Sequence, residues 1–94
     1  MAEVKHYPDG HKGAFGIEQG GTRVATMTYT MAGGTMVINH TEVDPVLRGT
    51  GAGGKLVDAA VNQARQDHLR INPVCPFAKA VFDKKPEYAD VLSR

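Results

Sequence analysis

Residues 35–68 have the sequence TMVINHTEV-DPVLRGTGAGG-KLVDAAVNQARQDH, and this stretch decides the fold. Its first nine residues are rich in β-branched side chains and contain no breaker, which predicts a strand over 35–43. Its last fourteen residues place apolar side chains at helical spacing, which predicts a helix over 55–68. Between them, residues 49–54 hold four glycines. A glycine loop that opens a helix presents backbone N–H groups, so it predicts a site for a phosphate or diphosphate.

The rest of the chain predicts a small sheet and few further helices. Three β-rich runs precede residue 35, and glycine turns that suit hairpins separate them, which indicates an antiparallel meander. After the long helix, a short apolar run precedes Pro76, a residue that suits the first turn of a helix. The predicted strands are 4–7, 14–18, 22–31, 35–43 and 70–74, and the predicted helices are 55–68, 76–83 and 87–92.

Composition restricts the class of protein. The chain has 94 residues, of which 41% are hydrophobic and 22% are charged, and this predicts one globular domain over 1–94. The net charge of +1 comes without a basic stripe, so we expect neither a nucleic acid nor a membrane as partner. A single cysteine, Cys75, excludes an internal disulfide, and no secretory leader is visible, which together favour a cytoplasmic protein. The oligomeric state does not follow from composition.

Two common phosphate-binding loops fit the glycines poorly. A dinucleotide-binding fold expects Gly-x-Gly-x-x-Gly after the first strand of a βαβ unit, but this loop follows a meander and Leu56 takes the place of the third glycine. A Walker A loop fits from Gly49 to Lys55, but Leu56 replaces the hydroxyl residue that binds Mg²⁺. A glycine turn with a purely structural role stays open as an alternative.

The loop and the segments after it resemble a known family. Val43-Asp44-Pro45-x-x-Arg48-Gly49-x-Gly51-x-Gly53 resembles the motif of the GNAT N-acetyltransferase superfamily that follows a long strand and opens a helix. Cys75-x-x-Ala78-x-x-x-Phe82 has the spacing of a later motif of that superfamily. The segments INHTEV, RGTGAGGKLV and NPVCPFAKAVFDKKPEY are similar to small stand-alone GNAT-like domains. Lys85 departs from their pattern, which has histidine before Pro-Glu-Tyr, so no role of that histidine is transferred to it.

The resemblance implies an α+β fold, a GNAT-like three-layer α/β arrangement. Its mixed, mostly antiparallel sheet would contain a splayed central strand pair, with about two to three helices. The resemblance also implies acetyl-CoA (or CoA) as co-substrate and no metal, with the diphosphate on the glycine loop and the pantetheine arm beside the strand. Because glycine tolerates left-handed backbone, we expect Gly51 and Gly53 to adopt positive φ. The residues implied to bind it are Thr41, Val43, Arg48, Gly49, Thr50, Gly51, Ala52, Gly53, Gly54 and Lys55.

The implied activity is acetyl-CoA-dependent transfer of an acetyl group to an amine acceptor, which could be a protein lysine, a peptide or a small amine. The early helices and late strands of larger family members are not evident here, so we expect an open acceptor cleft. Two alternatives from other classes remain. The chain could be a non-catalytic CoA or acyl-CoA binding module that serves as a sensor or adaptor, or a small interaction domain with a structural loop.

Acyl transfer to an amine needs a base, and the strand supplies two candidates. Alternation along a strand predicts that His40 and Glu42 lie on one face, with Asn39, Thr41 and Val43 on the other. Imidazole ordinarily titrates near neutrality, which makes His40 a candidate for proton transfer, and Glu42 is a second candidate base. Either residue could instead have no role beyond the strand itself.

Cys75 and Tyr88 are the candidates for the remaining chemistry. Cys75 directly precedes a predicted helix, where free amides lower the pKa of a thiol. It could protonate the leaving thiolate or carry the acyl group in a two-step transfer, or it could be an ordinary small core residue. Tyr88 could donate a phenolic proton or simply pack. The histidines show no metal-ligand spacing with Cys75, so we expect no metal site.

Overall fold

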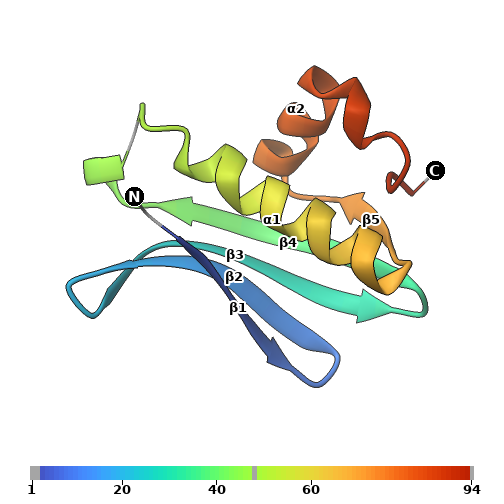
Figure 1. Ribbon diagram of the computed structural model, residues 1–94, viewed down its shortest axis with the longest axis horizontal. Helices are drawn as coiled ribbons and strands as arrows, with labels where there is room; N and C mark the ends of the chain where they lie inside the picture. Colours follow the sequence, from blue (N-terminus) through green and yellow to red (C-terminus); the bar gives the residue numbers. More distant parts are fainter. Residues whose placement is uncertain (1–2, 48, 94) are drawn as a thin grey trace.

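The computed structural model describes residues 3–47 and 49–93, and its centre is a five-stranded sheet (Figure 1). The strands lie side by side in chain order. Four of them form an antiparallel meander, and the fifth lies parallel to the fourth. Their bounds are β1 Val4–Asp9, β2 Lys12–Gln19, β3 Thr22–Ala32, β4 Thr35–Val43 and β5 Arg70–Pro73. The predicted meander is confirmed, with strands somewhat longer than predicted at the hairpin ends.

In the part of the chain that the structure describes, two longer and two short helices accompany the sheet, namely η1 Pro45–Leu47, α1 Ala52–Asp67, α2 Pro76–Lys84 and η2 Pro86–Tyr88. Helix α1 begins three residues before the predicted position, because residues 52–54 of the glycine loop form its first turn. The predicted last helix over 87–92 is wrong. The chain makes a short 3₁₀ turn there, and Leu92 then forms a parallel bridge with Ile71. None of the helices in 3–47 and 49–93 is long and apolar enough to cross a membrane.

Helix α1 connects β4 to β5 and packs along one face of the sheet. Its fully buried positions are Leu56, Val57, Ala60, Val61 and Ala64, which is the apolar stripe that the sequence predicts. They meet alternating side chains from the strands, among them Phe15, Met27 and Ile38. Full burial of each large apolar side chain stabilises the fold by about 1.5–3 kcal/mol. The glycine loop is therefore attached to the main core of the molecule.

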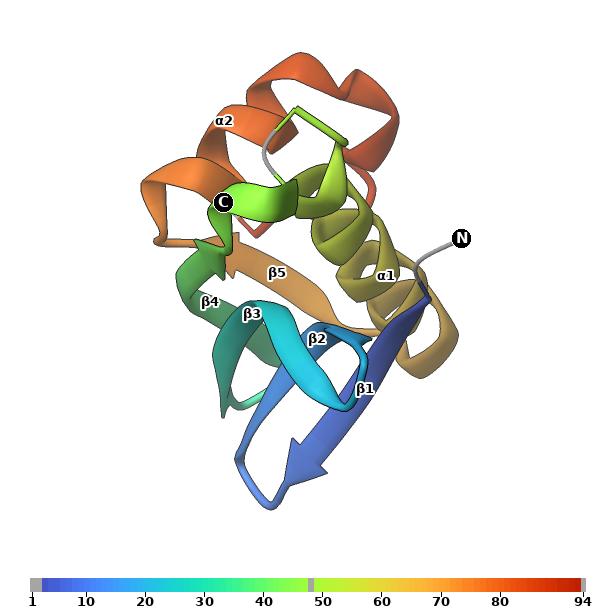
Figure 2. The same cartoon turned by 90° about the vertical axis from the view of Figure 1, so that its left-hand side faces the viewer.

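Both longer helices lie on this same face (Figure 2). Cys75, Ala78 and Phe82, at the start of and along α2, belong to the same core cluster as α1. The opposite face of the sheet, called the outer face here, carries Thr26 and Thr28, and no described helix covers it. The α+β class, the mixed sheet and the helix number are confirmed. Within residues 3–47 and 49–93, both longer helices pack on one face of the sheet and share its core.

A β-bulge divides β4 into two halves. Thr28 pairs with His40 but Tyr29 pairs with Ile38, so Asn39 is an extra residue on β4. Before the bulge Met36 and Ile38 are buried in the core; after it Thr41 and Val43 take that side. An extra residue also bends its strand and sharpens the local twist. The bulge therefore sets which side chains of the second half face the helices.

Candidate functional site

The two parallel strands β4 and β5 separate at the bulge. Their pairing runs from Thr35 and Arg70 to Ile38 and Pro73 and stops there. Pro73 has no N–H with which to continue the ladder, and the bend at Asn39 turns β4 away. The last contact is the Cys75 N–H, which donates to the Ile38 carbonyl at 3.0 Å. Beyond this point residues 39–43 have no β5 partner, which leaves a fork between them and residues 74–77. The predicted splayed strand pair is confirmed.

A cavity of about 440 Å³, the fork cavity, opens beside this free strand edge. It brings together seven of the ten residues predicted to bind the cofactor, from the strand and from the loop. Sequence reasoning missed two apolar side chains that also line it, Leu47 and Phe77. The lining residues are Thr41, Val43, Leu47, Gly49, Gly51, Ala52, Gly53, Gly54 and Phe77.

The other three predicted cofactor residues do not line the fork cavity. The Thr50 hydroxyl donates to the Leu47 carbonyl and so stabilises the turn. Lys55 lines a different cavity, on the other side of α1. Arg48 lies outside the residues that the structure describes.

The first turn of α1 presents unused N–H groups at the fork cavity. Gly51 is the N-cap, and no side chain caps the helix. The first bond of the helical ladder runs from the Lys55 N–H to the Gly51 carbonyl, at 3.1 Å. Within 3–47 and 49–93, the N–H groups of Ala52, Gly53 and Gly54 therefore have no acceptor. Such free amides at the positive end of the helix dipole favour a bound anion.

Gly51 and Gly53 are needed for different reasons. Gly51 has φ +80°, a left-handed value that L side chains rarely adopt, and a Cβ there would meet nothing within 4 Å. Gly53 has no positive φ, so that part of the prediction is wrong. A Cβ on Gly53 would instead lie 2.1 Å from Cζ of Phe77, because the phenyl ring packs against the helix at this point. Gly53 thus leaves room for an aromatic side chain that lines the cavity.

His40 and Glu42 lie on the outer face, away from the fork cavity. As predicted they share a face, with His40 Nε2 at 3.1 Å from Glu42 Oε1, and both side chains are exposed. Asn39 was predicted on the opposite face, and this is wrong. Its amide donates to the Thr30 hydroxyl at 2.9 Å, because the bulge adds a residue to the outer side.

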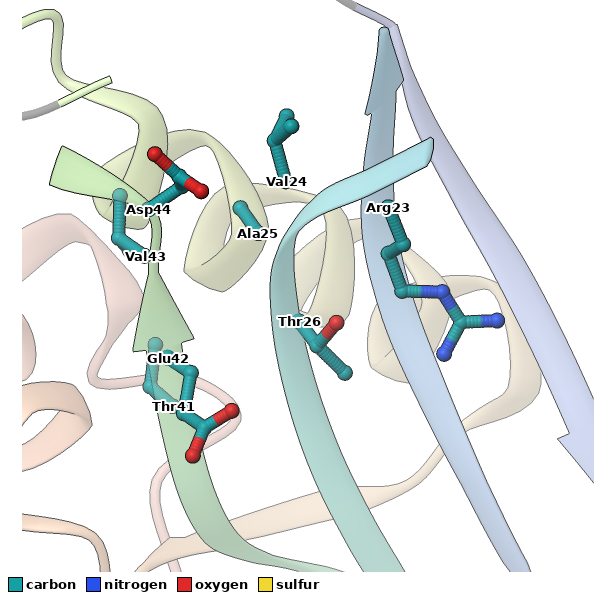
Figure 3. A pocket seen from close by; sticks show the side chains of 8 residues that line it. All are labelled: Arg23, Val24, Ala25, Thr26, Thr41, Glu42, Val43 and Asp44. Atoms are coloured by element: carbon teal, nitrogen blue, oxygen red, sulfur yellow. The ribbon is translucent and has the colours of Figure 1, made fainter. Parts of the chain in front are cut away.

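A second cavity, of about 470 Å³, lies between the ends of β3 and β4 (Figure 3). We call it the outer cavity. The Glu42 carboxylate extends from β4 toward β3, the Thr26 side chain lies over β3, and Asp44 lies beyond the end of β4. Thr41 and Val43 line this cavity and the fork cavity alike. The second half of β4 is therefore accessible from both cavities.

Cys75 is next to the fork cavity without lining it. The side chain is 5% exposed, and its thiol donates to the Thr41 hydroxyl at 3.5 Å. Burial by itself would raise the pKa of the Cys75 thiol, but the hydrogen bond with the Thr41 side chain and hydrogen bonds with the backbone at Ala78, Phe77 and Thr41 hold this pKa below its usual value. The predicted effect of the helix N-terminus on the thiol agrees with this direction. The sulfur thus contacts Thr41, a residue that lines the cavity.

Tyr88 does not face the second half of β4. Its hydroxyl donates to Asp58 Oδ1 at 2.8 Å, and the ring packs edge-on against Phe82. Burial and the Asp58 carboxylate raise the pKa of Tyr88 to about 12, so the phenol keeps its proton at neutral pH. The packing role that the sequence left open for Tyr88 therefore fits its place in the structure. The described residues contain no cluster of three or more metal-ligating side chains.

Comparison with known proteins identifies the family. Residues 14–91 match the family described as GCN5-related N-acetyl-transferase. Since this match covers most of the chain, the chain belongs to the GCN5-related N-acetyltransferase family. A sequence search of curated proteins found no match. The family resemblance stated from the sequence is confirmed.

Solved structures of acetyltransferases share the fold. A GCN5-like presumed N-acetyltransferase from Staphylococcus aureus is 34% identical, with TM-score 0.74 over 97% of this chain and 87% of that one. The ribosomal-protein-S18-alanine N-acetyltransferase from Escherichia coli has TM-score 0.67 at 15% identity, over 82% of this chain and 53% of that one. The IAA acetyltransferase from Bacillus cereus ATCC 14579 has TM-score 0.67 at 17% identity, over 89% and 75%. This chain spans about half the length of the Escherichia coli enzyme. By family, it is an N-acetyltransferase.

Proposed function

We propose that the protein takes acetyl-CoA as donor and transfers its acetyl group to an amine that enters from the outer face. One observation carries this proposal: the second half of β4 has a free edge at the fork cavity and also lines the outer cavity. A donor in the first cavity and an amine in the second would meet at Thr41 and Val43. The family supports the use of an acyl-CoA in general.

The fork cavity offers a distinct partner for each part of the donor. The free amides at the start of α1 suit a diphosphate without a metal. The edge of β4 that is free of β5 over residues 39–43 suits the amide groups of a pantetheine arm, which can hydrogen-bond as an added strand would. Leu47 and Phe77 provide apolar walls along the same path. A strand N–H at the end of this path would stabilise the oxyanion that forms on the thioester carbonyl.

The chemistry needs two proton transfers. As the C–N bond forms and the C–S bond breaks, the amine must lose a proton and the thiolate must gain one. His40 and Glu42 support the first transfer, because they form a hydrogen-bonded pair on the face from which the amine arrives. Cys75 supports the second, because its thiol lies one residue from the cavity at the start of α2. Its small exposure weighs against direct attack on the thioester, so we favour a single-step transfer.

The donor site is tested by calorimetry with acetyl-CoA. Gly51→Val forces a β-branched side chain into φ +80° at the amides, so we expect it to abolish saturable binding. Gly33→Val is the matched control. Gly33 has φ +63° with open space around it, but it lies in the β3–β4 turn, away from the glycine loop. Equal loss of affinity in both variants would mean that backbone strain disturbs the whole fold, and would remove the support for a loop-bound diphosphate.

Transfer itself is tested by mass spectrometry after incubation with acetyl-CoA and a panel of peptide and small-molecule amines. We expect acetylated amine with the wild type and strongly reduced product with the double variant His40→Gln, Glu42→Gln at unchanged affinity for acetyl-CoA. Acetyl-CoA binding without product or CoA release would favour a non-catalytic acyl-CoA binding module. The buried state of Cys75 and the exposed, solvated His40–Glu42 pair are the observations that keep this second function in view.

A further inference from the structure

A third cavity, the lysine groove, lies on the other side of the first turns of α1. Its volume is about 640 Å³, which falls within the usual range for small-molecule sites. Lys55 from α1 and Lys85 from the segment between α2 and η2 both line it, and Tyr88 forms part of its wall. Neither the diphosphate site nor the acceptor cavity accounts for it.

The groove and the fork cavity meet at the glycine loop. Gly51 and Gly54 line both of them. A diphosphate held by the free amides of this turn would therefore have one cavity on each side. A ligand with two arms joined by a diphosphate fits this arrangement, with one arm in each cavity.

The chemistry of the two cavities decides which arm goes where. The fork cavity has apolar walls and runs along an unpaired strand edge, which suits a chain of amides that ends in a thioester. The groove carries two ammonium groups. Within residues 3–47 and 49–93, neither Lys55 nor Lys85 forms an ion pair. The groove therefore suits the more strongly charged arm.

The one carboxylate of the groove does not neutralise these lysines directly. Asp58 Oδ1 accepts the hydrogen bond of the Tyr88 hydroxyl at 2.8 Å, and Asp58 Oδ2 lies 3.4 Å from the Asn62 amide nitrogen. Both carboxylate oxygens are thus engaged by neutral donors. A phosphate monoester carries a charge of about −2 near neutral pH, and lysine ammonium groups bind such a group as point charges.

We propose that the lysine groove binds the 3′-phosphorylated nucleotide end of CoA, and that Lys55 and Lys85 select CoA over dephospho-CoA. This inference rests on the proposed use of acetyl-CoA. It assigns Lys55 to the ribose phosphate instead of the diphosphate, and it gives Lys85 a ligand of its own. Lys85 is the residue that departs from the histidine of the similar small domains, so selectivity for the 3′-phosphate would belong to this chain's own sequence.

The test is calorimetric titration with CoA and with dephospho-CoA at low salt. We expect the wild type to bind CoA about tenfold more tightly, as two partly solvated charge pairs would give. Lys55→Gln and Lys85→Gln should each weaken CoA binding and leave dephospho-CoA unchanged, so that the double variant binds both alike. Lys84→Gln is the matched control, since Lys84 is an exposed neighbour that does not line the groove.

The outcomes separate this inference from the function on which it rests. If the wild type binds both ligands equally while Gly51→Val abolishes both, the loop-bound donor stands and the groove assignment is overturned. The same holds if Lys84→Gln reduces the preference as much as Lys85→Gln does. If the folded wild type binds neither ligand, the donor proposal fails and this inference fails with it.

Discussion

Deletion of Asn39 tests the role of the bulge in β4. Without Asn39 the ladder becomes regular, because Ile38 already pairs with Tyr29 and His40 with Thr28. His40 would stay on the outer face and Thr41 on the core face, so the core packing need not change. What changes is the bend of the strand. We therefore expect a folded protein whose β4 no longer turns away from β5.

The expected loss of affinity follows from the hydrogen bonds that this bend makes available. The free edge over residues 39–43 offers about two backbone bonds to the pantetheine arm, and each is worth a net 0.5–1.5 kcal/mol. Closing the fork removes both, which amounts to about 1–3 kcal/mol, or roughly a 5- to 150-fold weaker Kd for CoA. The diphosphate contacts at α1 are untouched, so some binding should persist.

Calorimetry with CoA measures this loss, and circular dichroism with urea denaturation confirms the fold. Asn39→Ala is the control, because it keeps the extra residue and removes only the exposed hydrogen bond to Thr30. We expect Asn39→Ala to bind CoA as the wild type does. Unchanged affinity in the folded deletion variant would refute the reasoning that the bulge opens the donor site.

Three further predictions concern residues around the site. Gly53→Ala should destabilise the wild type by about 1 kcal/mol, because the new methyl group forces the Phe77 ring away from the helix. In the Phe77→Ala variant the same substitution should be stabilising, because alanine favours a helix more than glycine does. Additive effects of the two substitutions in urea denaturation would contradict this. The pKa of Tyr88 is raised to about 12, so the protonated phenol stabilises the folded state fully below pH 10, and this stabilisation is lost as the pH rises toward 12. The free energy of unfolding of Tyr88→Phe should therefore decline less than that of the wild type over this range. Cys75 should react slowly with iodoacetamide because its side chain is buried. The pH dependence of that reaction gives the pKa of the thiol, and Thr41→Val should raise this pKa. An unchanged pKa in Thr41→Val would exclude the Thr41 hydrogen bond as the cause of the lowered pKa.

The sequence predicts the strands, the long helix and the loop because each depends on local chemistry. The β-branched run over 35–43 and the apolar stripe of 55–68 need no tertiary information to be recognised. The glycines of residues 49–54 likewise predict free amides, and among the described residues the N–H groups of 52–54 have no acceptor. Most of the predicted donor site follows from these three segments.

The rest depends on contacts between distant segments. The bulge arises from the pairing of β4 with β3, and nothing at Asn39 itself distinguishes an extra residue from a regular one. Gly53 looks like a loop glycine, whereas its requirement comes from Phe77, twenty-four positions later. The lysine groove likewise joins Val4 of β1 to Lys85 near the C-terminal end. Such long-range juxtapositions are invisible to patterns with a period of two or 3.6 residues.

An anchor made of peptide nitrogens has a consequence for how the enzyme responds to its surroundings. The amides of Ala52, Gly53 and Gly54 neither gain nor lose protons in the physiological range, and no oxidant modifies them. A diphosphate bound by them would therefore be held equally well across acidity and redox state. Any variation of donor capture with acidity would then come from the ribose phosphate in the lysine groove, whose second ionisation falls at about pH 6, and not from the loop that holds the diphosphate.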